Sequence, residues 1–125
     1  MEDGIEGLDD WLVFTKFLET SVADGLISLG TSLLASNVII EICETLGRTE
    51  ELLFQVPGVG TGPDKQALLV WDNGAQYLEI EVRSDGLLTL YYRDRAAGTA
   101  KCLCFKGAEA MALECRQLFV DNFLD

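Results

Sequence analysis

Apolar and polar residues alternate along the chain between positions 67 and 95, which include the stretch WDNGAQYLEIEVRSDGLLTLYYRDR at 71–95. A period of two places successive side chains on opposite faces of a β-strand. Asn73-Gly74 and Ser84-Asp85-Gly86 interrupt the alternation with residues that favour tight turns. The pattern therefore predicts three antiparallel strands joined by two short hairpin turns.

The pairing of these strands depends on the two turns. Asn73-Gly74 predicts a two-residue type I′ turn, which sets Trp71 opposite Gln76 and Leu69 opposite Leu78. The second turn has either two or three residues, and a slip of one residue would turn every side chain over. Only the three-residue turn, with Gly86 in the left-handed conformation, pairs apolar with apolar positions: Val82 with Leu88, Ile80 with Leu90, and Leu78 with Tyr92.

This register assigns each side chain to one of two faces. The predicted core face carries Ala67, Leu69, Trp71, Leu78, Ile80, Val82, Leu88, Leu90 and Tyr92. The opposite face carries Leu68, Val70, Tyr77, Glu79, Glu81, Arg83, Thr89, Tyr91 and Arg93.

The remaining segments complete an α+β prediction. Helices are expected from Asp9 or Asp10 to about Ser21, with an apolar stripe of Leu12, Val13, Phe17 and Leu18, from Ser28 to Leu46, and from Ala108 to Phe123. KCLCFK at 101–106 is predicted to add a strand, with Cys102 and Cys104 on one side and Leu103 and Phe105 on the other. We predict one α+β domain over 1–125, an antiparallel meander of three to five strands packed against N-terminal and C-terminal helices. Residues 1–8 are expected to form a flexible acidic lead.

Gly47 is expected to end the second helix, and 48–56 to add a short strand or turn. PGVGTGPDK at 57–65 is predicted to be a loop because of its glycine and proline content. Its spacing does not match the GxxxxGK[ST] pattern of a phosphate-binding loop. The uncharged segment 26–40 is too short for a membrane span and is predicted to be a buried helix.

The formal net charge of −12 and the isoelectric point near 4.2 narrow the expected partners. Such a charge disfavours nonspecific binding to nucleic acid or to anionic membranes. It suits a basic protein partner, a divalent cation, or solubility alone. Four cysteines and an acidic N-terminus that does not resemble a signal peptide favour reduced thiols in a cytoplasmic protein.

The chain offers little for catalysis. It has no histidine and no CxxC motif, so histidine-dependent triads and the commonest zinc sites are excluded. Glu79 and Glu81 share a strand face, roughly 7 Å apart, which permits acid–base chemistry or a divalent ion. Alternating glutamates are also usual on a solvated strand. We predict no catalytic residue, no metal and no cofactor, with a metal-dependent hydrolase using Glu79 and Glu81 as the alternative.

Tyrosine and arginine on the second sheet face favour binding instead. Both residue types are enriched at interface hot spots. The candidate binding residues for a protein partner are Tyr77, Glu79, Glu81, Arg83, Tyr91 and Arg93. Three arrangements stay open: a helix of the same chain covers this face, a partner or second copy binds there, or a small ligand does.

The segment from Pro57 to Trp71, followed by YLEIEV, a DG turn and YY, resembles a group of small bacterial proteins of unknown function. Their shared pattern is a helix, a proline-bearing loop, "PDGG", a strand ending in "EW", "LEIEI" and a "DG" turn. Here the PDGG position reads Pro63-Asp64-Lys65-Gln66, the EW position reads Val70-Trp71, and the group's upstream tryptophan-and-proline segment is absent. The resemblance covers about residues 26–95 and implies an α+β fold without assigning a function.

Together these observations predict a non-enzymatic cytoplasmic interaction module that binds a basic protein partner. It would act as an acidic antitoxin-like or inhibitor-like protein, phage- or defence-related in the most specific form, with neither nucleic acid nor membrane as a direct partner. A structural homodimer is the other alternative, and a dimer through the sheet face is compatible with the same residues.

Overall fold

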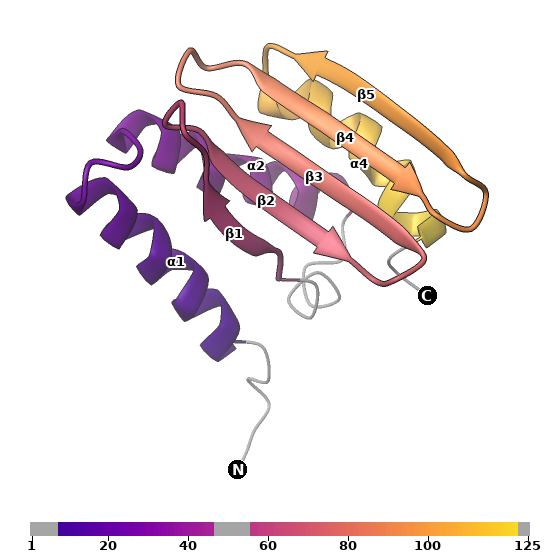
Figure 1. Ribbon diagram of the computed structural model, residues 1–125, viewed down its shortest axis with the longest axis horizontal. Coiled ribbons are helices and arrows are strands. Elements are labelled where there is room, and N and C mark those ends of the chain that lie inside the picture. The colour runs from indigo at the N-terminus through magenta and orange to yellow at the C-terminus, as the bar shows by residue number, and fades with distance from the viewer. Residues whose placement is uncertain (1–7, 47–55, 123–125) are drawn as a thin grey trace.

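Five antiparallel strands follow one another in a single sheet, in a computed structural model that describes residues 8–46 and 56–122. Their order across the sheet, β1-β2-β3-β4-β5, is their order in the chain (Figure 1). The strands are β1 (Gly58–Thr61), β2 (Ala67–Asp72), β3 (Gln76–Val82), β4 (Leu88–Asp94) and β5 (Thr99–Phe105). The arrangement is the predicted meander.

Three helices occupy the described ranges: α1 (Leu8–Ala23), α2 (Leu29–Leu46) and α4 (Ala108–Asn122). Helices α2 and α4 lie side by side on the same face of the sheet, and α1 lies next to β1 at one edge (Figure 1). Ser28 caps α2, since its Oγ accepts a hydrogen bond from the Thr31 N–H at 3.0 Å. The α+β prediction is confirmed, with helices at both ends of the chain.

The core forms where α2 and α4 meet the sheet. Every position predicted for the core face is buried except Tyr92, which is partly buried against the same cluster. The positions predicted for the opposite face all keep some exposure. The alternation along β2, β3 and β4 therefore assigned both faces correctly, because only one of them meets the helices. From the helices the core receives Phe14, Leu18, Ala35, Val38, Ile39, Ile42, Met111, Ala112 and Cys115.

The second turn has the predicted three residues. Val82 pairs with Leu88, the Arg83 N–H donates to the Leu87 carbonyl at 3.0 Å, and Gly86 has a φ of 88°. Asp85 fixes the turn further, since its Oδ1 accepts a hydrogen bond from the Leu87 N–H at 3.0 Å. Glycine is needed at this position because the left-handed region costs other residues a steric clash at Cβ.

The predicted register of the first hairpin is wrong by two residues. Trp71 lies opposite Leu78 rather than Gln76, and Leu69 lies opposite Ile80. A type I′ turn needs positive φ at both central residues, but Asn73 is not among the positive-φ residues and Gly74 is. The Asn73 N–H donates to the Gln76 carbonyl at 3.1 Å, which makes Gly74 and Ala75 the tip.

Side-chain hydrogen bonds explain why the tip moves by one residue. Asn73 Oδ1 accepts from the N–H groups of Ala75 and Gln76 at 3.1 and 2.7 Å. Asp72 Oδ1 accepts from the Gly74 N–H at 2.9 Å. Moving the tip by one residue shifts every strand pair by two, so the side chains keep their faces.

Other predictions need correction. Residues 58–61 form strand β1 rather than part of a loop, because their backbone pairs with β2 even though glycines hide any alternation. In α1, Phe14 and Leu18 are buried, whereas Leu12 and Val13 are 59% and 67% exposed. Segment 26–40 is only half buried, since Leu29, Leu33 and Ile40 face outward.

Gly47 and most of segment 48–56 lie outside the described residues, as does most of the predicted acidic lead. Within the described ranges, no helix combines the length and apolarity that crossing a membrane would require.

Candidate functional site

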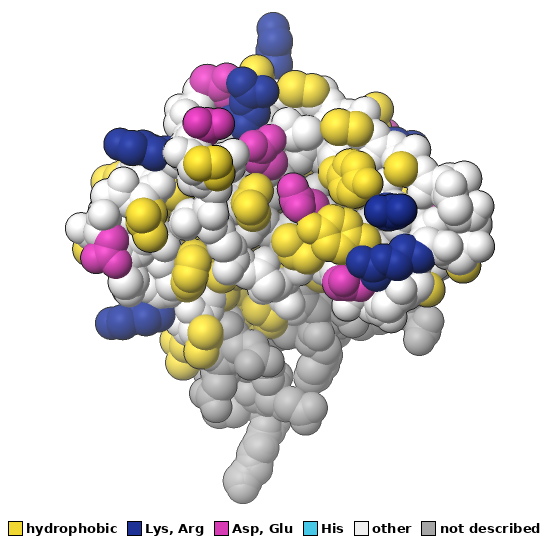
Figure 2. All heavy atoms as spheres, viewed as in Figure 1, with side chains coloured by type: hydrophobic (Ala, Val, Ile, Leu, Met, Phe, Trp, Pro, Cys, Tyr) yellow, Lys and Arg dark blue, Asp and Glu magenta, His cyan; other side chains and the backbone are white. Residues whose placement is uncertain are grey.

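The face of the sheet turned away from α2 and α4 is the strongest candidate for a site. We call it the open face, and its side chains come from alternate positions of the strands. The paired rows place Leu68, Val70, Asp72, Tyr77, Glu79, Glu81, Thr89, Tyr91, Arg93, Ala100, Cys102 and Cys104 on it. In the part of the chain that the structure describes, α2 and α4 both pack on the other side of the sheet. Figure 2 looks onto the open face and shows hydrophobic side chains beside acidic and basic ones.

Two tyrosines lie near the centre of the open face. Tyr91 is directly opposite Glu79, and Tyr77 is directly opposite Arg93. The two rings meet edge to face, with their centroids 6.1 Å apart and an interplanar angle of 70°. Aromatic pairs prefer this geometry because the positive edge of one ring meets the negative face of the other. The tyrosines are partly buried by one another and by their neighbours, although no described helix covers them.

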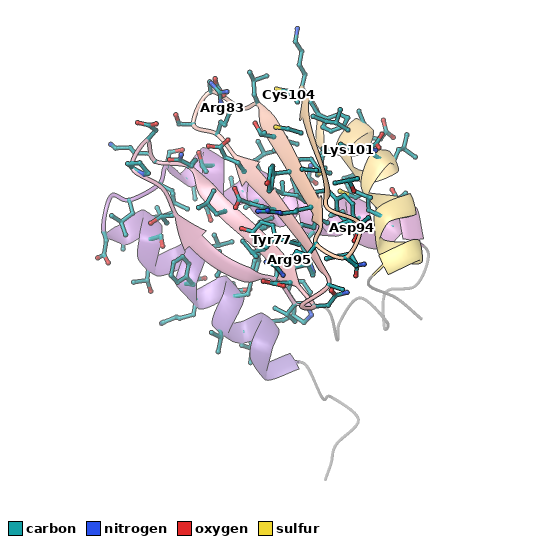
Figure 3. The ribbon with its side chains drawn as sticks, turned by 45° about the vertical axis from the view of Figure 1, so that its right-hand side comes forward. Tyr77, Arg83, Asp94, Arg95, Lys101 and Cys104 are labelled. Atoms are coloured by element: carbon teal, nitrogen blue, oxygen red, sulfur yellow. The ribbon has the colours of Figure 1, made fainter. Side chains whose placement is uncertain are left out.

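Arg95 joins this group from the loop that follows β4 (Figure 3). Its guanidinium carbon lies 5.5 Å from the centroid of the Tyr77 ring, within the range of a cation–π contact. The same guanidinium donates to both carboxylate oxygens of Asp72, at 2.7 and 3.2 Å, and to the Gly74 carbonyl at 3.0 Å. This contact lowers the pKa of Asp72 and raises that of Arg95. Arg95 therefore ties the β2–β3 turn to the tyrosines.

Glu79 holds Tyr77 from the other side. The Tyr77 hydroxyl donates to Glu79 Oε1 at 2.6 Å. This hydrogen bond, together with partial burial and the nearby negative charges, raises the pKa of Tyr77 to about 12. Deprotonation is opposed because it would remove the donor and place two negative oxygens side by side. The Tyr77 side chain is consequently fixed at two points: Arg95 lies over the face of its ring, and Glu79 accepts the hydrogen bond of its hydroxyl.

The six predicted binding residues do not form one group. Tyr77, Glu79, Tyr91 and Arg93 line a shallow depression of about 470 Å³ together with Arg95, and we call these five residues the tyrosine cluster. Glu81 and Arg83 belong to a second depression at the other end of the strands, lined also by Asp64, Gln66, Ser84 and Asp85. There Glu81 Oε2 accepts from Gln66 Nε2 at 3.0 Å, and Arg83 forms an ion pair with Asp85 at 2.9 Å.

This division does not favour the hydrolase alternative. Glu79 and Glu81 follow one another on the open face, but each accepts a hydrogen bond from a different neighbour and lines a different depression. A shared divalent ion would need both carboxylates turned toward one point. Within the described residues, no three histidine, cysteine or acidic side chains gather as ligands for a metal ion.

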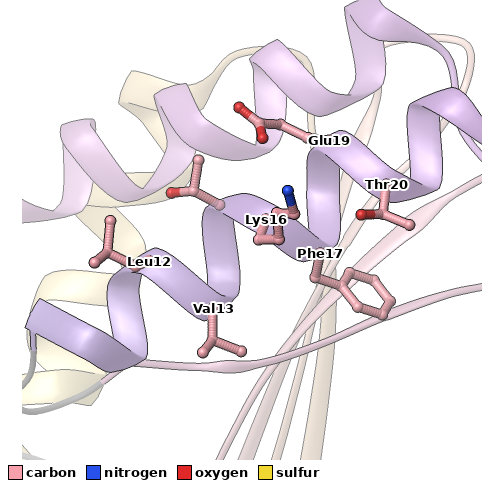
Figure 4. A pocket seen from close by; sticks show the side chains of 7 residues that line it. Leu12, Val13, Lys16, Phe17, Glu19 and Thr20 are labelled. Carbon is pink, nitrogen blue, oxygen red and sulfur yellow. The ribbon is translucent and has the colours of Figure 1, made fainter.

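A second exposed surface runs along α1. Leu12, Val13 and Phe17, with Lys16, Glu19 and Thr20 beside them, line a hollow of about 690 Å³ (Figure 4). Val13 and Phe17 also line a smaller hollow between α1 and the start of β1. The described lining of the larger hollow comes from a single helix and is mostly apolar. It has no fixed array of polar groups like that around Tyr77.

Sequence reasoning missed several side chains at or beside the open face. Arg95 and Asp72 lie at the ends of strands, where alternation gives no signal for a contact between two different turns. Cys102 and Cys104 were predicted to share a face, but that face became identifiable only from the pairing of Cys102 with Tyr91 and Cys104 with Thr89. Both thiols are exposed and free.

Comparison of the chain with protein-family models, with curated proteins and with solved structures gave no match. The functional argument therefore depends on the geometry of the open face.

Proposed function

We propose that this protein is a non-enzymatic interaction protein that binds a protein partner through the tyrosine cluster of its open face. The supporting observation is the fixed Tyr77–Tyr91 pair on a sheet face that no described helix covers. Side chains whose rotamers are already restrained lose little conformational entropy on binding. Tyrosine and arginine together supply apolar area and hydrogen-bonding groups, which is the usual composition of a hot spot.

Charge determines which partner this surface suits. Arg95 is neutralised by Asp72, while Arg93 has no ion pair within the described residues, so the cluster itself is of mixed sign. The chain as a whole carries −12. Long-range attraction therefore favours the approach of a basic partner, and the tyrosine cluster then provides the contact. An antitoxin-like or inhibitor-like protein, which is acidic and occupies a basic surface of its target, would combine long-range attraction and local contact in this way.

The test compares capture by three forms of the protein from an extract of its native host, with the bound proteins identified by mass spectrometry. The forms are the wild type, the double variant Tyr77→Ala/Tyr91→Ala, and the control Leu29→Ala/Leu33→Ala. The control removes exposed apolar surface from α2, on the other side of the sheet. Circular dichroism and thermal unfolding establish that all three are folded.

We expect the wild type and the control to retain the same basic protein and the tyrosine variant to lose it. With the purified partner, the tyrosine variant should bind at least about tenfold more weakly, since a hot-spot side chain contributes more than about 1 kcal/mol. Binding by the wild type should weaken as salt is added. Equal capture by all three forms, or no specific capture by the wild type, would overturn the proposal.

A further inference from the structure

The two edges of the sheet differ in length and in what lies beside them. Strand β1 has four residues, and α1 packs next to it. Strand β5 has seven residues, and among the described residues it pairs only with β4. Helix α4 contacts the core side of β5 without adding a strand to its edge (Figure 1). The outer edge of β5 therefore presents a row of backbone N–H and C=O groups without strand partners.

Two of the usual protections of an edge strand, a proline and a β-bulge, are absent from β5. Its sequence, TAKCLCF, has no proline. Its seven pairs with β4 run without interruption, so no bulge bends the edge away. The only charge within the strand is Lys101, and its ammonium group is drawn toward Glu114 of α4, at 3.4 Å. Long, regular edges of this kind are templates for another strand.

The side chains of β5 indicate that this other strand is a second copy of β5. A two-fold axis perpendicular to the sheet would relate two antiparallel β5 strands without exchanging the two faces of the sheet. Opposite side chains then lie on the same face only if one residue lies directly opposite its own copy. With the axis at Leu103, Leu103 meets Leu103, Cys102 meets Cys104, and Lys101 meets Phe105. With the axis at Cys102, Lys101 meets Leu103, and Phe105 meets Thr99. Of these two registers, only the one centred on Leu103 sets leucine opposite leucine and both cysteines opposite cysteines.

The register also keeps like charges apart. Residues 99–107 contain Lys101 and Lys106 and no acidic residue. Centred on Leu103, the pairing sets Lys101 opposite Phe105 and Lys106 opposite Ala100, so no two lysines lie directly opposite each other. We propose that two copies of this chain pair antiparallel along β5, centred on Leu103, to form one continuous ten-stranded sheet. The inference does not depend on the partner proposed above.

The pairing would place Cys102 of one copy opposite Cys104 of the other, twice. Directly opposite residues of an antiparallel pair have Cα atoms roughly 4.5–5.5 Å apart, which is within the disulfide range of about 4.4–6.8 Å. Both thiols are exposed, whereas Cys115 is buried. Burial also raises the pKa of the Cys115 thiol, which keeps it unreactive. A cross-link can therefore report the register.

The experiment uses the full chain with Cys43→Ser, oxidised gently with diamide, which takes up the two protons and two electrons released per disulfide. The parent should give a disulfide-linked dimer on non-reducing gels. Neither Cys102→Ser nor Cys104→Ser alone should cross-link, because each leaves one thiol opposite a serine. Mixing these two variants should restore a cross-linked dimer. Equal cross-linking by each single variant alone would overturn the register.

A second measurement tests the dimer without oxidation. Sedimentation of the reduced parent should give the mass of two chains, and the double variant Cys102→Lys/Cys104→Lys should give the mass of one chain, because lysines would then face lysines across the axis. Circular dichroism confirms that the double variant is folded. A monomeric parent at high concentration, or a lysine variant that remains a dimer, would overturn the proposal.

Discussion

Successive residues of β3 and β4 point to opposite faces of the sheet, and only one of these faces is covered by helices in the described part of the chain. Leu90 and Ile80 face α2 and α4 and have no exposed surface, while Thr89 and Glu79, one position away, keep contact with solvent on the open face. The core face is held by packing against helices. The open face is held by contacts within the sheet, such as those of Arg95 and Glu79 with Tyr77. The same strands therefore provide stability on one side and, on the other, the fixed tyrosine cluster that we propose as a binding surface.

The largest contrast should come from adjacent truncations on β4. Leu90→Ala removes a fully buried side chain and leaves a cavity, so it should lower the free energy of unfolding by about 2–5 kcal/mol. Thr89→Ala should cost less than about 1 kcal/mol, because the threonine loses mainly its strand preference on a partly solvated face. Urea unfolding measures both values, and equal losses would show that the open face is covered in solution.

A smaller contrast should come from adding carbon atoms. Ala67 is fully buried on the core face, so Ala67→Leu should overpack the core and destabilise the protein by about 1–3 kcal/mol. Gly60 of β1 lies on the open side of the pair with Leu68, has no positive φ, and a Cβ there would meet no atom within 4 Å. Gly60→Ala should be neutral or stabilise by up to about 1 kcal/mol. A destabilising Gly60→Ala would contradict the free space above this face.

The smallest effect should appear at high pH. Tyr77 has a pKa near 12 in the folded protein, above its ordinary value of 10, so the unfolded chain loses this proton first. The contribution to stability is complete below pH 10 and is lost as the pH rises toward 12.

Tyrosinate absorbance measures this titration, with Tyr77→Phe identifying the signal of Tyr77. Glu79→Gln should bring the pKa of Tyr77 closer to 10, because it removes the negative charge beside the hydroxyl. An unchanged titration in Glu79→Gln would mean that the hydrogen bond does not hold Tyr77 in solution.

Alternation predicted the two faces because burial on a sheet has the same period as the side chains. It could not distinguish registers that differ by two residues, since both leave Leu69 and Trp71 in the core. The error at Asn73-Gly74 arose because the Asn-Gly pair alone was taken to define a type I′ turn with these two residues at its tip. The observed turn is decided by the side-chain oxygens of Asp72 and Asn73 and by Arg95 from a distant loop.

The candidate site was predicted in part for a similar reason. Tyr77, Glu79, Tyr91 and Arg93 are neighbours across one strand pair, so their grouping follows from the register. Glu81 shares the face, and Arg83 follows it in the turn after β3, so both lie at the other end of the strand. Arg95 joins through the ends of two hairpins, a contact that no local pattern encodes. In α1, both helical stripes are apolar, so the predicted stripe included Leu18 but missed Phe14, which is also buried.

The order of the strands also has a consequence for folding. Each strand pairs with its neighbour in the chain, so the meander can close one short loop at a time at low entropic cost. The packing of α2 on α4 instead joins segments from opposite ends of this sequence. During synthesis α4 follows all five strands, and the core beneath β4 and β5 stays open until this helix emerges. Docking of α4 is therefore the event that completes the hydrophobic core of the nascent chain.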